Sequence, residues 1–69
     1  MGGLLSDQER RLAAVLDHES TAEILRRRRM HEEIIADPYA YPVMRDASEG
    51  ALVVIDLVLA KRAADLAAA

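Results

Sequence analysis

The chain contains no cysteine, phenylalanine or tryptophan among its 69 residues. The lack of cysteine excludes disulfide bonds, thiol nucleophiles and thiolate metal ligands. A chain of this length hides only about 60% of its unfolded surface, so small domains commonly rely on disulfides or on oligomerisation for stability. Because disulfides are excluded, we expect a partner chain to supply that support.

The chain also lacks a net positive charge and has few glycines. The net charge is −3, which provides no overall basic field for nucleic acid, and the three glycines form no phosphate-binding loop. No Ser/His/Asp arrangement is evident. We therefore expect a non-catalytic, cytoplasmic protein without a cofactor. Since 52% of the residues are hydrophobic and only 3% aromatic, the core must consist of aliphatic side chains, which is typical of packed helices.

One long apolar run is present, ALVVIDLVLA at residues 51–60, interrupted only by Asp56. It is about half as long as a membrane span, so no membrane association is expected. Its β-branched residues would also suit a buried strand. Helix is favoured because no second segment resembles a strand and because residues 61–67 are strong helix formers.

Helix start and stop signals define the expected fold. Ser6 and Ser20 are each followed three residues later by glutamate, the capping-box pattern, and Asp46 begins a looser version. Pro38 and Pro42 exclude a continuous helix through residues 37–42. We predict an all-α helical hairpin in a single domain over residues 1–69. It has a long helix from about 7 to 36, a loop at 37–42, a helix from about 43 or 47 to 66, and flexible residues 1–5.

The capping box at Ser20 leaves open whether residues 7–36 form one helix or two. Apolar side chains keep a single helical phase across Ser20. On this face lie Leu5, Leu12, Leu16, Ile24, Met30, His31 and Ile34. A chain that turned sharply would not need to keep that phase, so one long helix, bent near Ser20, is favoured.

The second helix carries two apolar stripes about 140° apart around its axis. The stripe expected to pack on the first helix comprises Leu52, Ile55, Leu59, Ala63 and Leu66. The stripe expected to form an interface comprises Val53, Leu57, Ala60 and Ala64, with Val54 beside it. Because most oligomers are closed homo-oligomers, we expect a homodimeric four-helix bundle, with another helical protein as the alternative partner.

Asp56 lies between the two stripes, where burial would require a cationic partner. In a hairpin closed at residues 38–42, facing residue numbers sum to about 80–84, which puts Asp56 opposite Arg26, Arg27 or Arg28. Arg27 lies on the inward face, so a buried Arg27–Asp56 ion pair is predicted. Gly50 costs about 1 kcal/mol inside a helix and predicts close packing against another backbone.

Four consecutive arginines, Arg26–Arg29, resemble a nucleic-acid patch but point around most of the helix circumference. Three of them have an acidic residue four positions away, in the pairs Glu23–Arg27, Arg28–Glu32 and Arg29–Glu33. A solvated, ion-paired helix is therefore favoured. The alternative is a nucleic-acid-associated regulator that binds through Arg10, Arg11 and Arg26–Arg29.

The remaining candidates are the histidines and tyrosines. His18 and His31 lack the Glu-x-x-His spacing of carboxylate metal centres, so no metal site is predicted and His31 is expected at the edge of the core. Tyr39 and Tyr41 are expected to cover the open end of the bundle, with a recognition loop as the alternative. An extended loop would turn one of them inward and leave the other free. The function expected from these features is a small protein-interaction or assembly module.

Overall fold

A computed structural model describes residues 5–68. These residues form three helices and no strand: α1 (Asp7–Asp17), α2 (Thr21–Ala36) and α3 (Pro42–Ala68). The all-helical class is therefore confirmed. The predicted flexibility of residues 1–5 falls, except for Leu5, outside the described residues.

Both predicted capping boxes begin helices. The Ser6 hydroxyl accepts the backbone N–H of Glu9 at 3.2 Å, and the Glu9 carboxylate accepts the N–H of Ser6 at 2.9 Å. The same exchange between Ser20 and Glu23 has distances of 3.1 and 3.2 Å. Each box satisfies backbone donors that a helix start leaves without partners.

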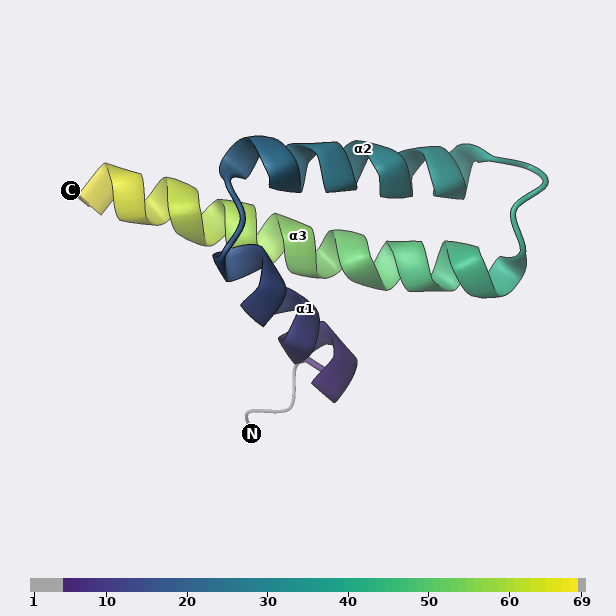
Figure 1. Cartoon of the computed structure of the whole chain (residues 1–69), viewed down its shortest axis with the longest axis horizontal. Helices are drawn as coiled ribbons and strands as arrows, with labels where there is room; N and C mark the ends of the chain where they lie inside the picture. Colours follow the sequence, from purple (N-terminus) through teal and green to yellow (C-terminus); the bar gives the residue numbers. More distant parts are fainter. Residues whose placement is uncertain (1–4, 69) are drawn as a thin grey trace.

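The prediction of one long helix over residues 7–36 is wrong. The chain turns sharply between Asp17 and Thr21, as Figure 1 shows, and α1 and α2 are separate helices. The continuous apolar phase has a different cause, because Leu16 and Ile24 both enter the same core after the turn. The capping box at Ser20 was the more reliable of the two conflicting signals.

The hairpin loop follows its prolines. Asp37, extended at φ −76° and ψ 115°, ends α2 before Pro38, and its side chain accepts the N–H of Tyr39 at 2.8 Å. Helix α3 begins at Pro42, earlier than the predicted 43 or 47, because proline suits the first helical position. The looser capping pattern at Asp46 therefore lies inside α3 and begins no helix.

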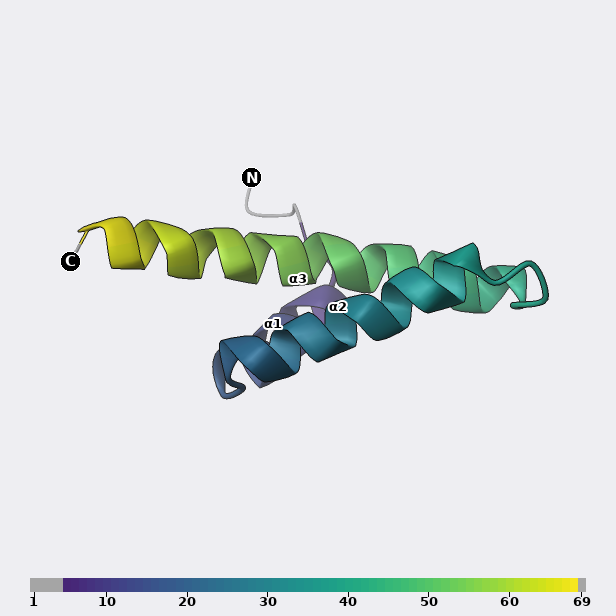
Figure 2. The ribbon, with the colours of Figure 1, turned by 90° about the horizontal axis from the view of Figure 1, so that it is seen from above.

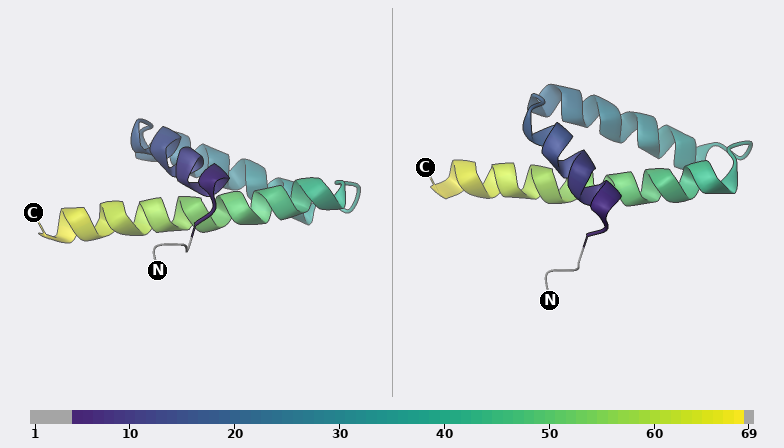
Figure 3. Two further views of the ribbon diagram at one scale, coloured as in Figure 1. Left: turned by 90° about the horizontal axis from the view of Figure 1, so that it is seen from below. Right: turned by 60° about the horizontal axis from the view of Figure 1, so that its bottom comes forward.

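Helices α1 and α2 each pack against α3. In Figure 2 both lie on the same side of α3, and no helix of the described chain covers its other side. The views in Figure 3 agree, and they show the C-terminal part of α3 extending past the other two helices. The chain is thus a thin layer, with Cα extents of 44 × 30 × 17 Å.

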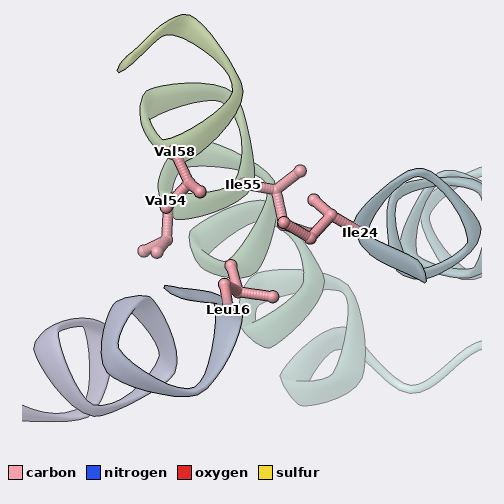
Figure 4. Packing of buried hydrophobic residues seen from close by; sticks show 5 residues of the cluster. All are labelled: Leu16, Ile24, Val54, Ile55 and Val58. Carbon is pink, nitrogen blue, oxygen red and sulfur yellow. The ribbon is translucent and has the colours of Figure 1, made fainter. Parts of the chain in front are cut away.

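The core is small and sits where the three helices meet. In Figure 4, Ile55 of α3 lies against Ile24 of α2, while Val54 and Val58 lie on the side of Leu16 in α1. Each buried aliphatic side chain contributes about 1.5–3 kcal/mol relative to exposure. Helix α1 therefore covers a part of α3 that the two-helix hairpin would have left bare.

Candidate interaction surface

The uncovered side of α3 carries a stripe of apolar and small residues. They recur at alternating spacings of three and four residues, the period that keeps one face of a helix toward a partner helix. We call this set the outer stripe: Gly50, Val53, Leu57, Ala60 and Ala64. Its two large side chains, Val53 and Leu57, are 53% and 52% exposed, so the stripe has apolar surface to bury.

Val54 does not belong to this surface, although it was predicted beside it. Its side chain is only 1% exposed and packs in the core near Leu16. The prediction failed because it assumed a two-helix hairpin. Once the chain turns at Ser20, α1 covers Val54 and leaves Val53 facing outward.

Among residues 5–68, Gly50 has no close neighbour that explains it. A Cβ built on Gly50 meets no heavy atom within 4 Å beyond its own helix backbone and adjacent residues. The predicted close packing against another backbone is therefore wrong for this chain on its own. Glycine inside a helix still lowers stability by about 1 kcal/mol relative to alanine.

The predicted buried pair between Arg27 and Asp56 is also wrong. Asp56 is exposed, and its carboxylate lies 3.5 Å from Nε of Arg28, one residue further along α2. Arg27 instead donates from Nε to the Glu19 carboxylate at 2.6 Å. The turn at Ser20 brings Glu19 beside Arg27. This contact lowers the pKa of Glu19 and raises that of Arg27, because each hydrogen-bonds the charged form of the other.

An open groove of about 340 Å³ runs along one edge of the outer stripe, between α3 and the first turn of α1. Its acidic members are Glu9 and Asp46. The pKa of Glu9 is lowered because its carboxylate accepts hydrogen bonds from the Ser6 backbone and side chain. The residues that line the groove are Ser6, Gln8, Glu9, Leu12, Asp46, Ala47, Gly50 and Ala51.

Arg62, near the C-terminal end of α3, holds the turn between α1 and α2. Its Nη2 donates to the carbonyl oxygens of Leu16 at 2.9 Å and Glu19 at 2.6 Å. Its Nη1 donates to Oγ1 of Thr21 at 3.0 Å. Sequence reasoning missed Arg62 because two of its three partners are backbone oxygens that only the turn makes available.

His31 lies between α2 and α3, as expected for a residue at the core edge. Its Nδ1 is 3.0 Å from the hydroxyl of Ser48, a buried residue of α3. Burial lowers the pKa of His31, and the nearby positive charge of Arg27 lowers it further. The neutral ring is therefore the form that suits this contact. The pairing joins two helices and explains why a polar serine occupies the core.

The arginine surface is partly occupied by contacts within the chain. Arg10 pairs with Asp7, Arg27 with Glu19 and Arg28 with Asp56. Within residues 5–68, the three predicted i,i+4 pairs of α2 do not form ion pairs. Three of the six arginines of this surface, Arg10, Arg27 and Arg28, thus contact acidic side chains.

The two tyrosines do not cover the end of the bundle. Tyr39 is 91% exposed and Tyr41 72% exposed, so the prediction that one of them turns inward is wrong. Val43, in the first turn of α3, is exposed beside them in the sequence. This end of the hairpin therefore presents apolar and aromatic surface to solvent.

Within residues 5–68, no cluster of three or more histidine, aspartate or glutamate side chains is placed to hold a metal ion. None of the helices in this range combines the length and apolar character needed to cross a bilayer. Comparisons with protein-family models, with curated proteins and with solved structures found no match to this chain.

Proposed function

We propose that this chain is a small, non-catalytic interaction module that binds a protein helix through the outer stripe of α3. The observation that carries the proposal is the half-exposure of Val53 and Leu57 on the one side of α3 that neither α1 nor α2 covers. A helix normally buries its apolar stripe, and here one of the two stripes has no partner within the described chain.

The small residues of the outer stripe support this proposal. Gly50, Ala60 and Ala64 allow another backbone to approach closely, while Val53 and Leu57 supply side chains to bury. An enzyme is not favoured, because the polar pair His31 and Ser48 is engaged between α2 and α3.

The proposal is tested by retention of proteins from an extract of the source cells on the immobilised chain. The informative variant is Leu57→Lys, and its matched control is Leu25→Lys, which alters a similarly exposed leucine on α2. We expect Leu57→Lys to abolish retention of a protein that the unaltered chain and the control both retain. The retained protein is then purified and its direct binding measured with the same three chains.

Circular dichroism must show that both variants keep their helices. Equal retention by all three folded chains would place binding elsewhere on the molecule and would overturn the proposal.

A further inference from the structure

We propose that the partner of the outer stripe is a second copy of this chain, with the two α3 helices antiparallel. This inference rests on the proposed function and specifies the partner. It starts from the size of the core. Within residues 5–68, five apolar side chains are buried: Leu16, Ile24, Val54, Ile55 and Val58. Chains this small commonly gain stability by oligomerising, and this one has no cysteine for disulfides.

The outer stripe complements itself when the two helices are antiparallel. Helix α3 runs from Pro42 to Ala68, so its midpoint is residue 55. With the two midpoints opposite each other, Val53 of one copy faces Leu57 of the other, about the axis of symmetry. At this register all 27 residues of each helix overlap, over a length of about 40 Å.

Gly50 supplies an independent argument. At the same register it faces Ala60 of the second copy, so two small residues meet and let the two backbones come close. Nothing in the described part of the chain requires glycine at this position, since an added Cβ would meet no atom within 4 Å beyond its own helix backbone and adjacent residues. Close approach of a second α3 explains a residue that the single chain does not explain.

The two ends of α3 are also suited to antiparallel pairing. Tyr41 and Val43 are exposed at the loop end of α3, and the outer stripe reaches Ala64 near its C-terminal end. Antiparallel pairing brings the loop end of one copy beside the C-terminal end of the other. Each copy can then shield apolar surface that the other leaves exposed, including the part of α3 that extends past α1 and α2 (Figure 3).

The charged residues near the outer stripe also favour the antiparallel orientation of the two α3 helices. Lys61, the only lysine, follows Ala60 along the edge of the outer stripe that borders the acidic groove. In the antiparallel pair it lies near the groove of the second copy, where Glu9 and Asp46 can pair with it. Parallel pairing in register would instead place the two Asp46 side chains against each other, an unfavourable like-charge contact.

Sedimentation equilibrium of the purified chain tests self-association. We expect a dimer at micromolar concentration, and we expect Val53→Lys to weaken dimerisation by at least about tenfold, because a buried lysine without a partner is costly. The matched control is Val15→Lys on α1, where the valine is 49% exposed. It should remain dimeric. A monomeric unaltered chain, or a Val53→Lys chain that dimerises normally, would overturn the proposal.

The Gly50→Gln variant distinguishes a loss of dimerisation from misfolding of the chain. Glutamine is a better helix former than glycine, and the chain has room for its Cβ, so the monomer should become more helical. The larger side chain should nevertheless weaken the dimer. A Gly50→Gln chain that dimerises as well as the unaltered chain would contradict close packing at this position.

Introduced cysteines test the orientation without background, since the chain has none. Copies carrying Gly50→Cys and copies carrying Ala60→Cys should form mixed disulfides on oxidation, whereas either variant alone should not. Identical positions are about ten residues apart along the axis in the antiparallel pair, or about 15 Å, which is too far for a disulfide. Rapid crosslinking of Gly50→Cys with itself would show parallel helices and overturn the proposed orientation.

The two proposals can fail separately. A purified chain that stays monomeric but retains a different protein through Leu57 overturns the second copy as partner and leaves the interaction module standing. A chain that neither dimerises nor retains any protein through the outer stripe overturns both.

Discussion

Arg62 connects three elements through one guanidinium group. Helix α1 ends with no basic residue in its last turn, so its terminal carbonyl groups lack a local cation. Arg62 supplies this charge from α3 by donating to the carbonyl oxygens of Leu16 and Glu19. A cation near a helix C-terminus is favourable because backbone dipoles leave partial negative charge there.

Replacing Arg62 with methionine should lower the free energy of unfolding by about 1–3 kcal/mol. The change keeps much of the apolar stem but removes hydrogen bonds to partly buried carbonyl groups. Urea unfolding monitored by circular dichroism gives the measurement. Arg29→Met is the control, because Arg29 is exposed on α2 and lies outside the outer stripe, and it should shift the midpoint much less. Similar losses in both variants would contradict a specific role for Arg62.

His31 predicts a dependence of stability on pH. Its pKa in the folded chain is lowered from 6.5, chiefly by burial and additionally by Arg27. Well above pH 6.5 the ring is neutral in both the folded and unfolded states. As the pH falls below this value, the unfolded chain takes up the proton first, so stability decreases.

Urea midpoints measured at pH 7.5 and pH 5.5 test this prediction. The unaltered chain should unfold at lower urea at pH 5.5, and His31→Gln should remove much of the difference. His18→Gln, at the exposed end of α1, should retain it. Glu9, Glu19 and Glu23 have pKa values lowered from 4.5, so the stability that they confer is lost only at more acidic pH. An unchanged pH dependence in His31→Gln would assign the effect to other groups.

At the scale of elements, the turn at Ser20 decides how much of the fold could be predicted from the sequence. The helical class, both capping boxes and the proline loop follow from local chemistry, and the structure has all of them. The direction of α1 could not be read from its apolar period, because Leu16 and Ile24 reach one core from two helices. That single error accounts for the misplaced Val54 and for the wrong partner of Arg27.

Ser20 should therefore matter to global stability. Ser20→Ala removes the side-chain acceptor for the Glu23 N–H and should lower the free energy of unfolding by about 0.5–2 kcal/mol. Ser20→Asp preserves an acceptor at the same position and should restore most of the loss. Urea unfolding of the three chains makes the comparison. An aspartate variant as unstable as the alanine variant would show that capping is not the cause.

At the scale of the whole molecule, the layer of three helices leaves much apolar surface exposed. The core residues could be predicted only in part, because their burial depends on which side of α3 receives α1. The exposed large apolar side chains are Val15, Leu25, Met30, Tyr39, Tyr41, Val43, Met44, Val53, Leu57 and Leu66. Within residues 5–68 they outnumber the five in the core. This excess of exposed over buried apolar side chains is more typical of a chain that assembles with a partner than of a monomer.

If the folded chain is stabilised by dimerisation, its thermal midpoint must depend on concentration. Mass action favours the dimer as concentration rises, and the unfolded chains remain separate. With an unfolding enthalpy of about 0.7 kcal/mol per residue, two chains of this size give an increase of about 5 °C for each tenfold rise in concentration. Thermal scans by circular dichroism between about 2 and 200 µM provide the measurement.

Val53→Lys should unfold at a lower temperature than the unaltered chain at every concentration in this range, because its dimerisation should be weakened. Val15→Lys should behave as the unaltered chain does. An unaltered chain with one midpoint at every concentration would mean that its five-residue core stabilises the fold without a second copy. The outer stripe would then have no part in the stability of the fold. Its role would be tested only by whether it binds a different helical protein.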